Sequence, residues 1–318
     1  MKISVVMPVY NAERYLEQSI NSVVNQSFTS WELICVDDGS TDNSGVLLNR
    51  LAQADKRIRV LNQENAGVTA ARYKGVQAST GDYIFFFDSD DVLHPDALSS
   101  LADAASRYGA DIACQSYKKV GADWVMSSGN EQPIPKKKYK LSNNPYRDVC
   151  NKNISIMVWG KLFHKKLFSG FEWPDISFAE DLYMTLCLIE KADRVFYAKD
   201  RVVYYRQHPG SSTKKFSLKK LDEVFDSVAL TLGKLSSSGR ADLKSVKRYI
   251  AKYQIFSLFT LVQGTRELEE RFVHRLNSCE YIGLADFTPL RALQVWLFMH
   301  GYERSLLLLR STIKKLKV

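Results

Sequence analysis

The chain has 318 residues, of which 45% are hydrophobic and 25% charged, a balance that excludes a disordered or low-complexity protein. Its formal net charge of +9 is unevenly placed, because residues 1–213 carry 25 basic and 25 acidic residues and residues 214–318 carry 19 and 10. Single hydrophobic cores stop growing at roughly 250 to 300 residues. We therefore expect two parts, a neutral domain at 1–213 and a basic region at 214–318.

The predicted elements of the first part alternate between strands and helices. Short apolar runs predict strands at 3–9, 32–36, 58–61, 83–87 and from 112 onward, and helical periodicity predicts helices at 14–26, 44–54, 68–78 and 95–108. This alternation is typical of a mostly parallel central sheet flanked by helices. A polar stretch at 127–144 is expected to be a surface loop.

The second half changes from strands to helices. A helix is predicted at 180–190 and two short strands at 195–197 and 202–205, and from residue 218 the pattern is helical, with breaks at 236–239 and 289. The fold class expected is therefore α/β with a helical C-terminal region.

The cysteines and the apolar runs indicate the cellular compartment. The five cysteines are odd in number, widely spaced and without a CxxC pair, which favours reduced thiols in the cytoplasm. Pro8 and the polar residues after it interrupt the first apolar run, so no export signal is expected. No apolar run approaches the roughly 18 residues of a membrane span. We expect a cytoplasmic protein whose membrane contact is at most peripheral, on the inner face of the cell membrane.

An acidic run follows the most aromatic strand. Asp88, Ser89, Asp90 and Asp91 come directly after the predicted strand 83–87, at the edge of the sheet where α/β proteins bind ligands. Crowded carboxylates repel one another, and a hard divalent cation offsets this repulsion. An EF-hand is disfavoured because Val92 stands at its third ligand position. The alternative is a solvated acidic turn.

Two further strand ends reach the same sheet edge. The sequence Met-Pro-Val-Tyr-Asn occupies 7–11, and Val-Asp-Asp-Gly-Ser-Thr-Asp occupies 36–42. Each pattern alone is common in turns, but their coincidence predicts a binding site. A carboxylate can accept a hydrogen bond from the imide N–H of a nucleobase, and the Tyr10 ring can pack on the face of that base. Neither GxGxxG nor a P-loop pattern is present.

Together with Asn-Ala-Gly-Val-Thr-Ala-Ala-Arg at 65–72, these segments resemble the signature set of family 2 glycosyltransferases. The resemblance is close over about residues 1–115. It continues more loosely through Trp-Gly-Lys-Leu-Phe at 159–163, Glu-Asp at 180–181 and Tyr-Tyr-Arg-Gln-His-Pro-Gly-Ser-Ser at 204–212. It implies a glycosyltransferase A fold, inversion at the anomeric carbon, and a catalytic, nucleotide-sugar-binding role for residues 1–213.

The resemblance also implies roles for individual residues. It places Pro8, Tyr10 and Asn11 around the nucleoside, Asp38 on the base, Asn65 and Arg72 near the base or diphosphate, and Asp88 against the ribose or sugar, with Ser89, Asp91, Arg206 and Ser211 also contacting the donor. Asp90 is the expected principal ligand of a divalent metal, Mn²⁺ or Mg²⁺, and His208 is expected to reach that metal. Charge on the departing diphosphate explains the need for a cation.

Inversion also requires a base near the acceptor. Asp181 is the expected general base, with Glu180 as the reserve candidate. Two acidic residues at a helix N-terminus are also favoured by the helix dipole alone, so a purely structural role stays open. Trp159, Lys161, Trp173 and Tyr183 are candidates for the acceptor site or, equally, for the core.

The expected function is transfer of a hexose or N-acetylhexosamine from a UDP-sugar to a hydroxyl of a saccharide or lipid-linked acceptor, in surface polysaccharide or lipopolysaccharide biosynthesis. One alternative is a sugar nucleotidyltransferase, although that activity favours a glycine-rich, basic loop after the first strand. The other is a non-catalytic nucleotide-sugar or nucleic-acid binding protein. No RNA-binding signature is present, so we expect no nucleic-acid partner.

The C-terminal helices are amphipathic and basic. Residues 249–262 and 303–317 combine apolar side chains with Lys and Arg. Such helices can lie on an anionic membrane surface. They can also pack on the catalytic domain or form a homodimer, and the sequence leaves all three open.

Overall fold

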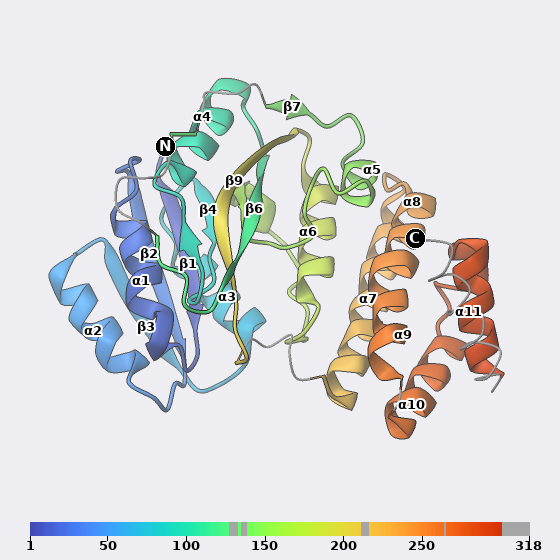
Figure 1. Cartoon of the computed structure of the whole chain (residues 1–318). Coiled ribbons are helices and arrows are strands. Elements are labelled where there is room, and N and C mark those ends of the chain that lie inside the picture. The colour runs from blue at the N-terminus through green and yellow to red at the C-terminus, as the bar shows by residue number, and fades with distance from the viewer. Residues whose placement is uncertain (127–132, 135–138, 211–215, 264, 301–318) are drawn as a thin grey trace. The chain divides into compact units, whose positions relative to one another are not determined.

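The computed structural model describes residues 1–126, 133–134, 139–210, 216–263 and 265–300 (Figure 1). The chain divides into two compact units, Met1–Lys214 and Lys215–Val318. Within the described residues, no helix is long and apolar enough to cross a membrane.

The first unit is built on one nine-stranded sheet. Its strands are β1 (Ile3–Val9), β2 (Trp31–Asp38), β3 (Ile58–Gln63), β4 (Tyr83–Phe86), β5 (Val92–Leu93), β6 (Ile112–Gly121), β7 (Lys140–Leu141), β8 (Lys161–His164) and β9 (Val195–Gln207). They are arranged in the order β3-β2-β1-β4-β8-β6-β9-β5, with β7 paired to β9. Strands β3, β2, β1 and β4 are mutually parallel, whereas β8 runs antiparallel to β4 and β6. The carboxyl ends of the four parallel strands therefore meet at one edge.

Helices cover both faces of this sheet. They are α1 (Glu13–Val24), α2 (Ser44–Ala54), α3 (Val68–Ala78), α4 (Ala97–Tyr108), α5 (Pro145–Cys150) and α6 (Glu180–Lys191). On one face, the odd-numbered side chains of β1 join the apolar face of α1 and residues of α4 in the main core. On the other face α3 lies close to β1, because a Cβ at Gly75 would come within 2.3 Å of Val6 Cγ1. The mixed α/β architecture expected from the sequence is confirmed.

The sheet differs from the prediction at β9. The sequence predicts two short strands, whereas β9 is continuous over 13 residues. Its pairing with β6 is irregular between Cys114 and Tyr117, and Tyr197 and Arg201 pair with Cys114 and Ser116. The polar residues at 199–201 therefore lie at a bulge, which interrupts the apolar pattern without ending the strand. This long strand carries the chain to His208.

The second unit is helical. It contains α7 (Leu218–Ser238), α8 (Leu243–Tyr249), the π-helical segment η2 (Ile250–Ile255), α9 (Phe256–Val262), α10 (Arg266–Asn277) and α11 (Pro289–Met299). Ile250, Ile255 and Phe259 are fully buried. These side chains of 249–262 therefore belong to the core of this unit, whereas Leu261 is 59% exposed. Membrane contact through this segment stays a prediction. Residues 303–317 lie outside the described residues.

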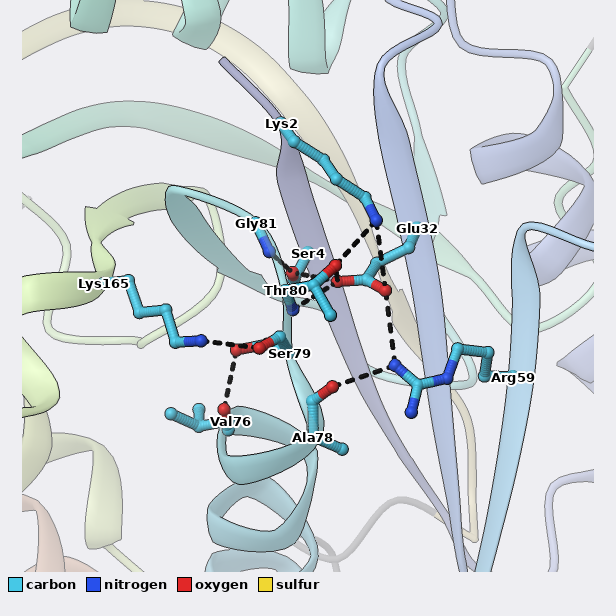
Figure 2. A network of polar contacts seen from close by, with 10 residues as sticks. All are labelled: Lys2, Ser4, Glu32, Arg59, Val76, Ala78, Ser79, Thr80, Gly81 and Lys165. Carbon is cyan, nitrogen blue, oxygen red and sulfur yellow. Dashed lines mark hydrogen bonds and ion pairs between the residues drawn. The ribbon is translucent and has the colours of Figure 1, made fainter.

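A polar network lies at the amino ends of strands β1 and β2 (Figure 2). Glu32 of β2 is 5% exposed, and its Oε1 accepts hydrogen bonds from Ser4 Oγ at 2.7 Å, Thr80 N at 2.6 Å and Thr80 Oγ1 at 2.8 Å. Lys2 and Arg59 each lie 3.4 Å from Oε2. Burial alone would raise the pKa of Glu32, but these hydrogen bonds and the charge of Lys2 lower it to about 2.

Glu32→Gln should therefore destabilise the protein by roughly 2 kcal/mol at pH 7, since a neutral amide cannot replace these charge-assisted hydrogen bonds. The lowered pKa means that ionised Glu32 stabilises the fold above pH 4.5 and that this contribution is lost as the pH falls towards 2. Urea unfolding should show the wild type and variant converging over that range. Glu17→Gln, at an exposed ion pair with Arg50, is the matched control and should have little effect. A loss for Glu32→Gln that did not depend on pH would contradict this account.

Candidate active site

The loops after β1 and β2 are bonded to each other at the carboxyl edge of the sheet. Asn11 adopts the left-handed conformation with φ of 48°. Its Oδ1 accepts a hydrogen bond from Thr41 N at 2.8 Å, and its own N–H donates to Ser40 Oγ at 3.1 Å. Tyr10, just before it, is 51% exposed, and Pro8 is partly buried. The arrangement leaves the Tyr10 ring available to pack on a planar ligand.

Asp38 holds the loop that follows β3. Its Oδ1 accepts from Gln63 Nε2 and Ala66 N, both at 2.8 Å, and its Oδ2 accepts from Gly67 N at 2.9 Å. The side chain is 4% exposed, so most of its accepting capacity is already used within the protein. Asn65, in the same loop, is exposed. Asp38 therefore fixes the position at which Asn65 is presented.

A carboxylate and an imidazole meet beyond the ends of β4 and β9. Asp90 Oδ2 lies 2.9 Å from His208 Nε2, and both side chains are partly exposed. Asp88 is also partly exposed, and Ser89 lies between the two aspartates. No group of three or more His, Cys, Asp or Glu side chains with metal-binding geometry occurs among the described residues. A carboxylate oxygen and an imidazole nitrogen fit a divalent cation whose other ligands are phosphate and water oxygens.

Arg72 forms the centre of a second charged cluster. This side chain of α3 is 2% exposed, and its Nη1 donates to Glu180 Oε1 at 2.6 Å. Its Nη2 donates to Asp88 Oδ1 at 3.2 Å, and Asp181 Oδ1 lies 3.8 Å from Nη1. One buried guanidinium thus connects the acidic turn after β4 to both acidic residues at the start of α6.

The start of α6 combines an unusual backbone conformation with hydrogen bonds that hold it in place. Ala179 has φ of 64°, which is unusual for a residue with a Cβ, and it turns the chain into the helix. Asp181 Oδ1 accepts from Val158 N at 3.2 Å. The preceding segment is tied to α3, because Thr69 Oγ1 donates to Ile176 O at 2.5 Å. A Cβ on Gly67, whose φ is 88°, would lie 2.4 Å from Ser177 Oγ, so this approach requires glycine.

The surroundings of Asp181 favour its protonated form. Burial and the charge of Glu180 raise the pKa of Asp181 to about 7, although Arg72 and the Val158 N–H oppose the shift. Burial likewise raises the pKa of Asp88 to about 6, with Arg72 opposing the shift and Asp90 adding to it. A carboxylate with a pKa near 7 can accept a proton in one step and release it in another near neutral pH.

Several candidate residues are more buried than their expected roles require. Asp91, Arg206 and Arg72 are 0%, 1% and 2% exposed, and each forms hydrogen bonds to other protein groups. Asp91 Oδ2 and Arg72 Nε are nevertheless buried without a hydrogen-bond partner among the described residues. Trp159, Lys161 and Tyr183, offered as acceptor-site candidates, are buried as well, whereas Trp173 is partly exposed. Ser211 lies outside the described residues.

The structure adds two residues that the sequence reasoning missed. The Tyr15 ring lies 4.8 Å from the His208 ring and 4.7 Å from the Arg206 guanidinium carbon. Gln18 Oε1 accepts a hydrogen bond from Arg206 Nη2 at 2.6 Å. Both residues belong to α1, where helical periodicity gives no indication that they contact a chain segment almost 200 residues away.

The fold is that of a known class of solved structures. S. aureus TarS, residues 1–349 in complex with UDP-GlcNAc, superposes with a TM-score of 0.75 over 99% of this chain and 92% of that chain, at 17% sequence identity. A second structure of the same TarS fragment, with UDP, gives a TM-score of 0.68. The expected glycosyltransferase A fold is therefore confirmed.

Residues 4–168 match glycosyl transferase family 2, and the chain belongs to this family. It is 29% identical over 271 residues to glycosyltransferase GlyA of Streptococcus pneumoniae, and 30% identical over 223 residues to the uncharacterized glycosyltransferase EpsJ of Bacillus subtilis. These matches cover 83% and 67% of this chain but only 38% and 63% of the two relatives. A poly(ribitol-phosphate) beta-glucosyltransferase of Bacillus spizizenii is 31% identical over 64% of this chain and 32% of its own length.

Proposed function

We propose that this protein is an inverting, metal-dependent glycosyltransferase that moves a hexose or N-acetylhexosamine from a UDP-sugar to a hydroxyl of a saccharide or lipid-linked acceptor. The observation that carries the proposal is the pairing of two acidic centres through Arg72. One centre is the Asp90–His208 pair, and Arg72 bonds to Asp88 in the same turn as Asp90. The other centre is Asp181, which lies beside the same guanidinium. A sugar transferred between them would have a cation on its leaving-group side and a base on its acceptor side.

The donor side follows from the exposed groups at the sheet edge. Tyr10 would pack on the uracil, with Asn11, Pro8 and the loop held by Asp38 around the nucleoside, and with Asn65 near the base or diphosphate. UDP and UDP-GlcNAc bound to TarS support a uridine donor. Asp88 and Ser89 would contact the ribose or sugar. Asp90 and His208 would hold Mn²⁺ or Mg²⁺, which supplies positive charge to the departing diphosphate.

The acceptor side follows from Asp181. Its carboxylate would remove the acceptor hydroxyl proton as the hydroxyl oxygen attacks the anomeric carbon, while the bond from that carbon to the diphosphate oxygen breaks. Attack from the face opposite the leaving group inverts the configuration. Arg72 and Glu180 would keep the Asp181 carboxylate in place, because the short Arg72–Glu180 ion pair fixes the first turn of α6.

A panel of labelled nucleotide sugars tests this proposal. Release of UDP from one sugar nucleotide, dependent on Mn²⁺ or Mg²⁺ and on Asp181, is the expected result. Formation of a sugar nucleotide from a sugar phosphate and a nucleoside triphosphate would instead identify a nucleotidyltransferase. Binding without turnover of any donor would favour the non-catalytic alternative.

We further propose that the protein works in the cytoplasm at the inner face of the cell membrane, in surface polysaccharide or lipopolysaccharide synthesis. The name of the Bacillus spizizenii relative, a poly(ribitol-phosphate) beta-glucosyltransferase, supports a polymer as the acceptor. Leu293 and Trp296 of α11 are 44% and 39% exposed, and residues 301–318 carry five basic residues and one acidic residue. Exposed apolar side chains that are followed in the sequence by a basic segment suit anionic lipid.

Removal of residues 303–318 should abolish co-sedimentation with anionic phosphatidylglycerol vesicles, whereas the full chain should pellet with them. Neutral phosphatidylcholine vesicles are the control, and neither the full nor the shortened chain should pellet with them. Equal pelleting of the full and shortened chains would contradict membrane attachment through this segment.

A further inference from the structure

Arg206 is the largest fully buried side chain of the described residues. Its Nε donates to Asp90 O at 2.8 Å, its Nη1 to Ala122 O and Trp124 O, both at 2.8 Å, and its Nη2 to Gln18 Oε1 at 2.6 Å. A buried guanidinium is costly unless its N–H groups are bonded. Here four such bonds compensate for its burial.

These bonds bring three chain segments together. Asp90 belongs to the turn after β4, Ala122 and Trp124 to the segment after β6, and Gln18 to α1. The main chain of Arg206 adds another link, because its N–H donates to Asp91 Oδ1 at 2.8 Å. The turn that carries Asp90 is therefore held both by the side chain and by the backbone of Arg206.

The same residue is connected to His208. His208 follows Arg206 by two positions, directly after the end of β9. The Tyr15 ring contacts both side chains, at 4.8 Å from the His208 ring and 4.7 Å from the Arg206 guanidinium. Asp90 and His208 are 118 residues apart in the sequence. Asp90 is bonded to the Arg206 side chain through its carbonyl oxygen, and His208 is linked to Arg206 through the short chain between them and the shared Tyr15 ring.

We propose that Arg206 is the positioning residue of the metal site and sets the separation of Asp90 and His208, with Tyr15 and Gln18 as its supports. The inference rests on the proposed metal-dependent function. The bonds of the guanidinium run to carbonyl and amide oxygens in three directions, which only a planar fork of donors can satisfy. Lysine retains the charge but lacks this geometry, so Arg206→Lys separates positioning from charge.

The test measures binding of UDP by calorimetry with Mn²⁺ and with EDTA, and binding of Mn²⁺ itself by electron paramagnetic resonance in the presence of UDP. Arg206→Lys should weaken Mn²⁺ binding about tenfold or more, as loss of a residue that supports a metal ligand typically does. The affinity for UDP in EDTA should change less than about twofold. Arg14→Lys is the matched control, since Arg14 also contacts the Tyr15 ring, at 5.1 Å, but is exposed.

Equal weakening of UDP binding with and without metal would indicate general disruption and overturn the proposal, as would unchanged Mn²⁺ affinity in a folded Arg206→Lys protein. If Arg206→Lys does not fold, Gln18→Met becomes the deciding variant, because it removes one hydrogen-bond partner of Arg206 and leaves the arginine unchanged. A several-fold loss of Mn²⁺ affinity is then expected, and no loss would overturn the proposal. Absence of metal-dependent UDP binding in the wild type would instead reject the proposed function itself.

Discussion

Replacing Asp181 with asparagine should lower the rate of glycosyl transfer about 1,000-fold, while UDP binding stays within about twofold of the wild type. The amide keeps the shape of the side chain but cannot accept the acceptor hydroxyl proton, and a positioned general base is worth about 100- to 10,000-fold. Single-turnover transfer and calorimetric binding of UDP measure the two quantities separately. Glu180→Gln is the companion variant. It should reduce the rate less, because Glu180 acts through Arg72 and the position of α6.

Retention of a tenth of the wild-type rate by Asp181→Asn would exclude Asp181 as the base. If Glu180→Gln lost more activity than Asp181→Asn, Glu180 would be the base in its place.

The pH dependence of the wild type offers an independent check on Asp181. Its pKa is raised to about 7, so the fraction in the proton-accepting form increases as the pH rises through that value. The kcat/KM for transfer should therefore rise between pH 5 and 7 and level off above about pH 8. The same raised pKa implies that ionised Asp181 opposes folding. Asp181→Asn should accordingly raise the melting temperature by a few degrees at pH 8, with a smaller gain as the pH is lowered towards 4.

Asp90→Asn should remove the benefit of metal for donor binding. A neutral amide oxygen is a much weaker ligand than a carboxylate for Mn²⁺ or Mg²⁺, and a bound cation would stabilise the leaving diphosphate by several kcal/mol. We expect transfer to fall at least about 100-fold, and UDP to bind the variant in Mn²⁺ no more tightly than it binds the wild type in EDTA. His208→Ala should weaken metal-dependent binding in the same direction.

Asp103→Asn is the matched control for this substitution, since Asp103 lies on α4 in a surface ion pair with Arg107. Full metal dependence in Asp90→Asn would contradict its role as principal ligand. Unchanged metal-dependent affinity for UDP in His208→Ala would exclude only His208 as a metal ligand.

Much of the fold was predictable because local pattern and tertiary structure agree in the first half of the chain. The helices at 44–54 and 68–78 begin and end where periodicity predicts, and β1 and β4 follow their apolar runs. Strand β8 and the continuity of β9 were not predictable. The bulge opposite Cys114 accommodates polar residues within a strand, and antiparallel pairing of β8 between β4 and β6 depends on long-range contacts.

The candidate site was predictable only where acidic side chains directly follow a predicted strand. Asp88 and Asp90 have a recognisable position in the sequence, and Asp181 was identified through the family resemblance. Three-dimensional packing determines the burial of Arg72 and Arg206, and no local pattern distinguishes an arginine that contacts a ligand from one that bonds to protein groups. Tyr15 and Gln18 were missed for the same reason. Their roles depend on contact with a strand end near residue 206.

Thermal unfolding of the wild type with UDP, in Mn²⁺ and in EDTA, tests the central claim most directly. A ligand at about 100 times its dissociation constant stabilises the folded state by about 2.7 kcal/mol. UDP with Mn²⁺ should therefore raise the melting temperature by several degrees, and UDP with EDTA should raise it clearly less. The same melting temperature with and without UDP in Mn²⁺ would contradict a metal-dependent UDP-sugar site at Asp90 and His208.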